Sequence, residues 1–224
     1  ATTEIYPLSL HDALPICPWR VSPRRKKVPS AKLGRWRWLA LPVLAFVALA
    51  LLSLAPHPLV QRIHYPLNYQ ALLLSEARRT GLPVTLVAAL IREESRFSAQ
   101  ATSPVGARGL MQLMPETAQW VDEHLEGNPA RNLDLSKPEI NLRLGTTYLE
   151  YLSQRFQGQE ISFLAAYNAG PSCALQWQAE ARAGQLQLDD IKYPETRAYV
   201  EAVLESERMY RELYPELRLS VAGP

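Results

Sequence analysis

Beyond residue 66 the apolar residues recur at helical spacing, and alternating strand patterns are almost absent. Proline and glycine mark most of the predicted helix ends. The predicted helices are 67–79, ended by Gly81; 83–97, opened by Pro83; 115–127, opened by Pro115 and ended by Gly127; 136–158, with Ser136 as cap and Pro138 as first residue; 160–170; and 194–214. Six or seven helices joined by short loops predict a mainly α fold with one compact helical domain.

The helix predicted over 83–97 closes on two adjacent acids, Glu93 and Glu94. Each helical residue turns by about 100°, so with Leu86 at zero the large apolar side chains point in a mean direction of about 90°. On the same scale Glu94 falls at about 80°, within the apolar stripe, and Glu93 at about 340°, outside it. The pattern therefore predicts that Glu94 faces the interior and that Glu93 faces solvent.

A carboxylate on the packed face of a helix is costly unless it is paired, protonated or placed at the edge of a cleft. Partial desolvation raises its pKa, which suits a general acid working near neutral pH. Periodicity alone leaves one alternative open, in which the helix ends at Glu94 and the side chain turns to water.

Two further stretches combine glycine with polar side chains. The loop Gln100–Leu113 contains Gly106 and Gly109, whose lack of a side chain lets backbone groups approach a ligand closely. The stretch "LAAYNAGP" places Tyr167 and Asn168 at the end of a short helix, before a Gly-Pro stop. That pair suits the lining of a sugar site, and it equally suits an ordinary capping turn.

Charge and cysteine content exclude some classes of partner. Residues 1–55 hold eight Lys and Arg against two acids, and the remainder holds sixteen against twenty. A mildly acidic body argues against nucleic acid as a partner. Cys17, Cys173 and the four histidines show no metal-ligand spacing, so we expect neither a metal nor a cofactor.

The stretch Leu39–Ala55 is apolar and uncharged, and it follows the basic block "RRKKVPSAKLGRWRW". It predicts a transmembrane or signal-anchor helix, with the basic side in the cytoplasm and one pass through the cytoplasmic membrane. The alternative is a cleaved signal peptide, with small residues at Ser53 and Ala55 before the candidate site, although Pro56 directly after that site disfavours cleavage. Under both interpretations the domain beyond residue 56 lies on the periplasmic, extracytoplasmic side, either anchored or secreted.

These patterns predict five parts of the chain. They are a basic segment 1–38, a membrane segment 39–55, a linker 56–66, one domain 67–216 and a tail 217–224. Within the first part, Tyr6–Ile16 resembles the translation of a sequencing adapter, so residues 1–16 carry no functional argument.

Five stretches, taken in order, resemble the catalytic domain of the soluble lytic transglycosylases, relatives of goose-type lysozyme. They are "ALIREESRF", "ATSPVGARGLMQLMPETA", "INLRLGTTYLEYL", "FLAAYNAGP" and "YPETRAYVEAVL", which together span about 84–214. The combination of these motifs in this order is highly specific. The resemblance implies a single lysozyme-like helical domain that cuts the glycan strands of bacterial peptidoglycan.

The resemblance also implies roles for the matched residues. Glu94, directly before Ser95, stands where the family has its single catalytic acid/base. The implied substrate-binding residues are Ser95, Ser103, Gln112, Met114, Tyr167, Asn168, Glu195 and Tyr199. The chain departs from the family in Ser172, where glycine is common, and in Tyr193, where phenylalanine is common.

A family member cleaves the bond between N-acetylmuramic acid and N-acetylglucosamine and leaves 1,6-anhydromuramic acid ends. Most glycosidases use two carboxylates, and no second acid in this sequence has an evident claim to the role. Asp134, Glu139 and Glu160 stand in helix-start contexts, as caps or first-turn acids. A hydrolytic muramidase on the same scaffold and a non-catalytic peptidoglycan-binding domain remain the alternatives.

Overall fold

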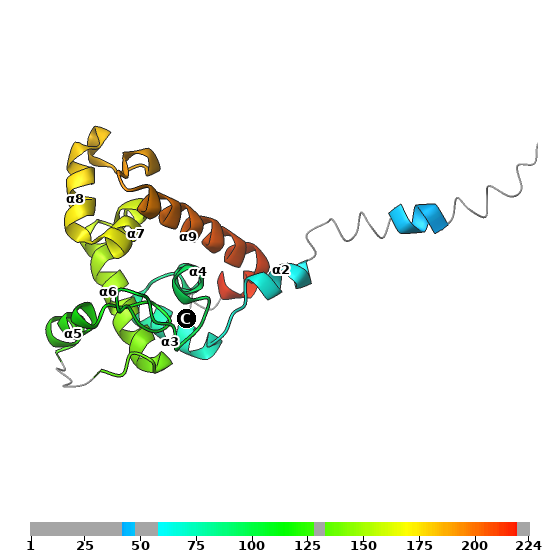
Figure 1. Ribbon diagram of the computed structural model, residues 1–224, viewed down its shortest axis with the longest axis horizontal. Coiled ribbons are helices and arrows are strands. Elements are labelled where there is room, and N and C mark those ends of the chain that lie inside the picture. The colour runs from blue at the N-terminus through cyan, green and yellow to red at the C-terminus, as the bar shows by residue number, and fades with distance from the viewer. Residues whose placement is uncertain (1–41, 48–57, 128–132, 219–224) are drawn as a thin grey trace, which may run out of the picture. The chain divides into compact units, whose positions relative to one another are not determined.

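The computed structural model describes residues 42–47, 58–127 and 133–218. Its contacts divide the chain into two units, 1–51 and 52–224. In the first unit, residues 42–47 are helical and exposed. The described part of the second unit contains the α-helices of Figure 1: α2 (Pro58–His64), α3 (Gln70–Thr80), α4 (Val84–Ser95), α5 (Pro115–His124), α6 (Pro138–Arg155), α7 (Glu160–Ala169), α8 (Pro171–Glu180) and α9 (Pro194–Leu213).

Helix α4 is the core of this unit. Every residue from Val84 to Ile91 is buried, because α3 packs on one side and the long helix α9 runs along the other. The helix ends where Arg96 and Phe97 adopt left-handed backbone conformations, with φ of 50° and 63°. These two residues end α4 directly after Glu94 and Ser95, and they begin the loop to α5.

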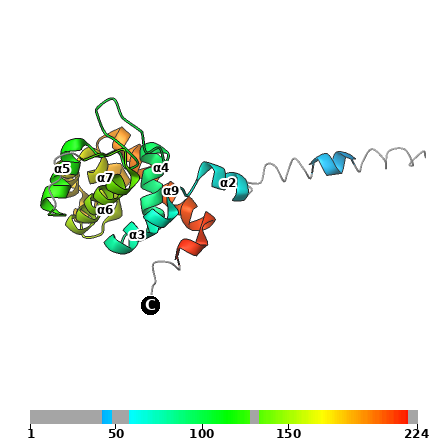
Figure 2. The same ribbon diagram turned by 90° about the horizontal axis from the view of Figure 1, so that it is seen from below.

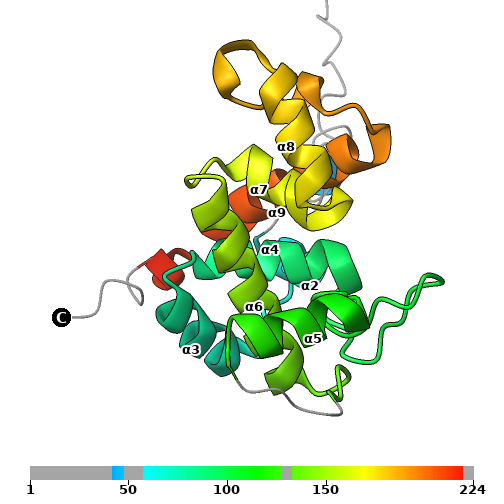
Figure 3. The same cartoon turned by 90° about the vertical axis from the view of Figure 1, so that its left-hand side faces the viewer.

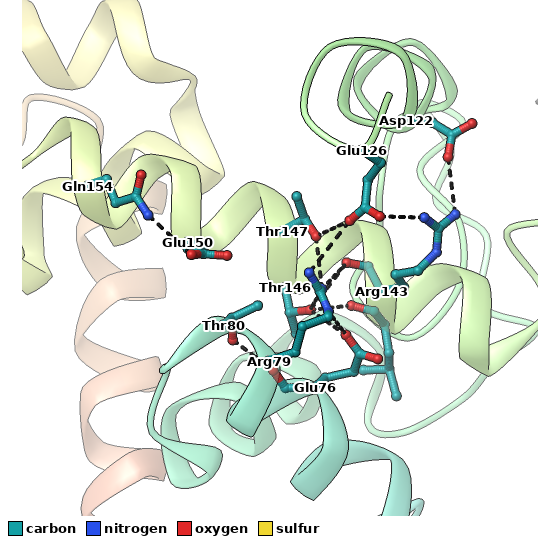
Figure 4. Close-up of polar contacts among 11 residues, drawn as sticks. Glu76, Arg79, Thr80, Asp122, Glu126, Arg143, Thr146, Thr147, Glu150 and Gln154 are labelled. Carbon is teal, nitrogen blue, oxygen red and sulfur yellow. Dashed lines mark hydrogen bonds and ion pairs between the residues drawn. The ribbon is translucent and has the colours of Figure 1, made fainter. Parts of the chain in front are cut away.

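Helix α6 is the second organising element, and it lies between α3 and α5 (Figure 3). A network of ion pairs joins the three helices (Figure 4). On the α3 side, Arg79 pairs with Glu76 at 2.8 Å and donates to Thr147 of α6 at 2.9 Å. On the α5 side, Arg143 of α6 pairs with Glu126 at 2.6 Å and with the buried Asp122 at 3.1 Å. The C-terminal end of α5 is therefore held in register with α6.

The loop between α4 and α5 extends beyond the helices (Figure 2) and is shaped by backbone hydrogen bonds rather than by a regular sheet. Isolated bridges join Thr102 to Arg108 and Arg108 to Leu113. Gly109 has φ +79°, and a Cβ there would meet Asn141 Nδ2 and the Leu135 carbonyl oxygen at 2.2 Å. Only glycine fits that position, because both its backbone conformation and its close approach exclude a side chain.

The described residues confirm a mainly helical fold without extended strands, and they correct several details of the prediction. Helix α8 was not predicted, although Pro171 is its first residue. Ser136 does not cap α6, because its hydroxyl donates to Asp134 at 2.6 Å and Lys137 occupies the N-cap position. Helix α5 ends at His124, before Gly127.

The predicted boundaries of the domain also differ from the described structure. The segment predicted as linker contains α2, which Arg62 ties to the end of α9 through a 2.5 Å hydrogen bond to the Leu213 carbonyl. Leu217, predicted as the start of a tail, is buried in the core. The folded unit is therefore longer at both ends than the sequence motifs indicate.

Within the described residues, no helix combines the length and the apolar character that a membrane crossing requires. The membrane segment predicted over 39–55 lies outside the described residues except for 42–47.

Candidate functional site

Glu94 and Tyr199 form the centre of the site. The Tyr199 hydroxyl of α9 donates a 2.7 Å hydrogen bond to Oε1 of Glu94, at the end of α4. Burial raises the pKa of Glu94 to about 7, the hydrogen bond from Tyr199 opposes that shift, and the charge of Glu93 adds to it. The carboxyl group is thus held in one orientation and titrates near neutral pH, as a general acid requires.

Tyr167 and Met111 form the wall beside Glu94. Tyr167, from the last turn of α7, donates its hydroxyl to the Met111 carbonyl oxygen at 2.8 Å. Burial raises the pKa of Tyr167 well above its usual value, and the nearby Glu94 carboxylate raises it further. The phenol therefore stays protonated and neutral next to the acid.

Asn141 of α6 holds the backbone of this wall at Met111, and it was not identified from the sequence. It is fully buried and accepts a 2.8 Å hydrogen bond from the Met111 N–H. Its Nδ2 donates to the carbonyl oxygens of Arg108 at 2.9 Å and Leu135 at 3.0 Å. A buried amide on an otherwise apolar helix face is the signal that could have identified it, because such a group requires partners.

Polar residues of the loop are mostly engaged in holding the loop itself. The Ser95 hydroxyl donates to the Leu110 carbonyl oxygen at 2.7 Å, which ties α4 to the loop. Ser103 accepts from the Ala107 N–H at 3.0 Å. Gln112 has φ +45°, and its Nε2 donates to the carbonyl oxygens of Ala101 and Gly109 at 3.2 and 3.0 Å. The nitrogen of Gln112 is used in this way, which leaves its oxygen as the atom for a ligand.

The remaining predicted site residues lie at helix starts and ends. Met114 precedes α5 and is 36% exposed. Asn168, exposed at the end of α7, accepts a 2.8 Å hydrogen bond from the buried Thr196 of α9. Glu195 is exposed in the first turn of α9. Thr196 was missed in the sequence, although it stands inside the "PETRAY" motif.

Glu93 differs from the prediction that it faces solvent. Its side chain is partly buried, forms an ion pair with Arg92 and accepts a 2.5 Å hydrogen bond from Ser206 of α9. The helical wheel failed here because it treats α4 as having one packed face. Helix α9 runs along the side on which Glu93 lies, so a second face is covered as well.

No group of three or more histidine, cysteine or acidic side chains that could hold a metal ion occurs in the described part of the chain.

Three comparisons place these features beside known proteins. Residues 72–189 match the family described as Transglycosylase SLT domain. Over 84% of its length the chain is 34% identical to the soluble lytic murein transglycosylase of Escherichia coli K12, and it covers 29% of that protein. It is 28% identical to the membrane-bound lytic murein transglycosylase C of Edwardsiella ictaluri, over 72% of this chain and 51% of the relative.

Solved structures agree with this similarity. The lytic transglycosylase Slt of Pseudomonas aeruginosa, solved as an inactive glutamate-to-glutamine variant, aligns with a TM-score of 0.64 and 36% identity. The alignment covers 73% of this chain and 26% of that one. The chain thus spans less than a third of the length of the soluble relatives that it matches.

Proposed function

Since the chain belongs to the transglycosylase SLT domain family, we propose that it is a lytic transglycosylase acting on the glycan strands of peptidoglycan. The observation that carries the proposal is the Glu94–Tyr199 pair. A single carboxyl group is partly buried, oriented by a 2.7 Å hydrogen bond and has its pKa raised to about 7. We assign the role of catalytic acid and base to Glu94.

In the first step protonated Glu94 gives its proton to the oxygen of the bond between N-acetylmuramic acid and N-acetylglucosamine. The bond from C1 to that oxygen breaks, and the acetamido oxygen of the muramic acid stabilises the cationic carbon. Tyr199 keeps the carboxyl group oriented and stabilises the carboxylate that the proton transfer leaves behind. The side-chain oxygen of Gln112 lines the position of the sugar, together with Tyr167, Asn168 and Met114.

In the second step the Glu94 carboxylate takes the proton of the muramic acid 6-hydroxyl, and that oxygen bonds to C1. An anhydro ring forms, and Glu94 returns to its protonated state. The 6-hydroxyl is tethered to the reacting sugar, so its effective concentration can exceed that of a loosely held water. The neighbouring acid, Glu93, is engaged with Arg92 and Ser206, which disfavours it as a base for water.

The role of Glu94 is tested by comparing Glu94→Gln with the matched variant Glu93→Gln on purified cell-wall sacculi. The loss of turbidity should stop almost entirely in Glu94→Gln, because an amide cannot transfer the proton. In Glu93→Gln the rate of turbidity loss should fall by less than about tenfold, because the amide oxygen still accepts the hydrogen bond from Ser206. The assignment is overturned if Glu94→Gln keeps most of the activity or if Glu93→Gln is the inactive variant.

We also propose that residues 39–55 anchor the domain in the cytoplasmic membrane, with the catalytic unit on the periplasmic side. The basic block before the apolar stretch supports this orientation. The relatives include proteins named as soluble and as membrane-bound, so family membership is compatible with either location.

A further inference from the structure

Two acids from different helices meet at the start of α7. Glu160, in the first turn of α7, forms a side-chain hydrogen bond with Glu207 of α9, and the two helices pack against each other (Figure 1). The site around Glu94 uses neither of these acids. Two ionised carboxylates have no proton to share, so this hydrogen bond exists only while one of the two groups is protonated.

Glu207 is the acceptor of this carboxyl pair. Its side chain is buried, forms an ion pair with Arg211 one turn later on α9, and accepts a 3.3 Å hydrogen bond from the Thr85 hydroxyl of α4. Both of these partners donate, so they stabilise Glu207 as a carboxylate. Glu160 is therefore the member of the pair that carries the shared proton.

The surroundings of Glu160 determine when it loses that proton. In the described part of the chain, the charged groups that act on it are Glu207 and Arg211, both from α9. Burial raises the pKa of Glu160 to about 7, the charge of Glu207 and the hydrogen bond with it add to the shift, and the charge of Arg211 opposes it. The carboxyl pair should therefore lose its shared proton close to neutral pH.

A cavity beside Glu160 gives the ionised side chain room to turn away from Glu207. Its volume is about 330 Å³, and Glu160 lies in its wall. The other lining residues are neutral: Gln159, Ile161, Gln185, Leu186, Gln187 and Leu204. None of these side chains can form an ion pair that would compensate for the lost contact with Glu207.

The other polar contacts at the start of α7 are weak. The N-cap residue Gln159 forms no side-chain cap, and it follows Gln157 and Gly158, which have left-handed φ values of 54° and 73°. The side chain of Gln159 accepts from Ser162 and from Gln178 of α8, both at 3.3 Å, which is long for a hydrogen bond. The contact between Glu160 and Glu207 is therefore an important polar restraint on this turn.

We infer that the carboxyl pair Glu160–Glu207 is a pH-sensitive switch, closed in acid and open in alkali, that fastens the start of α7 to α9. When Glu160 loses its proton, the two carboxylates repel each other, Glu207 keeps Arg211 and Thr85, and Glu160 turns toward the cavity. Helix α7 carries Tyr167 at its other end, so the switch acts on the helix that forms the wall beside Glu94.

The sign of the effect on stability follows from the raised pKa. The ordinary pKa of a glutamate is 4.5, so the stability that neutral Glu160 contributes is fully present below pH 4.5 and is lost as the pH rises through about 7. Because Glu160 is only half-buried, solvent screening reduces the size of this loss.

Thermal unfolding of the full chain at pH 6 and pH 8.5 tests the switch. Every protein carries Glu94→Gln, which removes the titration of the other acid with a pKa of about 7. Adding Glu160→Gln keeps a donor for Glu207 at every pH, because an amide N–H replaces the acid proton. Between the two pH values, its Tm should fall by about 3–5 °C less than the Tm of Glu94→Gln alone.

Glu139→Gln is the matched control. Glu139 also lies in the first turn of its helix, α6, but it is exposed. The variant removes the same charge from the same helix position, so its fall in Tm should match that of Glu94→Gln alone to within about 1 °C. Equal falls in the chains with and without Glu160→Gln would overturn the inference, as would an effect of Glu139→Gln as large as that of Glu160→Gln.

Hydrogen exchange shows whether the effect lies at the start of α7. The Phe163 N–H donates to the Gln159 carbonyl oxygen at 3.0 Å and reports on this turn. After correction for the chemical effect of pH, its exchange in Glu94→Gln should be about threefold faster at pH 8.5 than at pH 6. Adding Glu160→Gln should abolish this acceleration. No acceleration in Glu94→Gln, or an equal one in both chains, would contradict the switch.

Neither measurement involves a substrate. The inference can therefore fail while the parent chain still releases anhydro products, and it can hold while the proposed reaction fails.

Discussion

At the scale of single residues, the environment of Glu94 sets a pH dependence. The first step needs the protonated acid, and burial raises the pKa of Glu94 to about 7. Activity on sacculi should therefore fall as the pH rises through about 7. The charge of Glu93 contributes to the raised pKa, so Glu93→Gln should move this descending limb to lower pH.

Initial rates between pH 5 and 9, measured on parent and Glu93→Gln, check this prediction. An identical limb in the two proteins would show that Glu93 does not influence the titrating group. A limb shifted to higher pH in Glu93→Gln would contradict the stated electrostatics.

The same carboxyl group should link stability to pH. The folded pKa of Glu94 lies above its ordinary value of 4.5, so the stability associated with the neutral form is fully present below pH 4.5 and is lost as the pH rises through about 7. Glu94→Gln is free of that loss, since its amide does not ionise. The variant should be more stable than the parent above pH 7, by on the order of 2–3 kcal/mol.

Urea unfolding at pH 4 and pH 8.5 provides the measurement. The difference between the two proteins should shrink toward zero at pH 4, and the comparison cancels other titrating groups such as Glu160, which both chains share. A parent that is more stable than Glu94→Gln at pH 8.5 would contradict a raised pKa.

At the scale of elements, the loop between α4 and α5 depends on a residue of α6. Asn141 accepts from the N–H of Met111 and donates to the carbonyl oxygen of Arg108, both in this loop, and it donates to the carbonyl oxygen of Leu135 in the segment before α6. Asn141→Ala should lower the free energy of unfolding by about 2–4 kcal/mol, because it leaves buried polar groups without partners. Asn168, which is itself exposed, is the matched control; Asn168→Ala should cost less, about 1 kcal/mol, because it leaves only the Thr196 hydroxyl without its partner.

Chemical unfolding of the two variants measures this difference. Equal destabilisation by Asn141→Ala and Asn168→Ala would show that the loop does not depend on α6. Loss of activity in an Asn141→Ala protein that remains folded would agree with the link from Met111 to Tyr167.

The sequence predicted the elements that have a strong apolar period and a clear stop. Helix α3 ends at Thr80, directly before Gly81, and α7 ends at Ala169, directly before Gly170, so the two glycines stop the helices as expected. Helix α8 was not predicted because Gly170 and Pro171 were interpreted only as the stop of α7. Pro171 is also the first residue of the next helix. Glu93 and Asn141 were missed for a different reason. The partner of Glu93, Ser206, lies on α9, and Met111 and Arg108, which bond Asn141, lie in the loop between α4 and α5, so neither contact is visible in the local pattern.

The orientation of Glu94 toward the core could be predicted from one helix, since it depends on local periodicity. The hydrogen bond from Tyr199 could not, since it joins residues 105 positions apart. The contact between the rings of Trp120 on α5 and Tyr151 on α6 could not be predicted either, because each helix contributes only one of the two rings.

At the scale of the whole molecule, the basic and apolar N-terminal segment predicts attachment to a membrane. The full chain should stay in the membrane fraction after a high-salt wash, because the interaction is apolar. A chain beginning at His57 should be soluble and should digest sacculi. Recovery of the full-length protein as a shortened soluble species would instead favour signal cleavage.

Mass analysis of the muropeptides released from sacculi tests the central claim most directly. Closure of the ring by the 6-hydroxyl gives products ending in 1,6-anhydromuramic acid, lighter by one water than hydrolysis products and without a reducing end for borohydride. Because Glu94 alone supplies the proton and takes one back, the parent chain should release these products and Glu94→Gln should release almost none. Mainly reducible muramic acid ends from the parent chain would contradict the account and favour a hydrolytic muramidase.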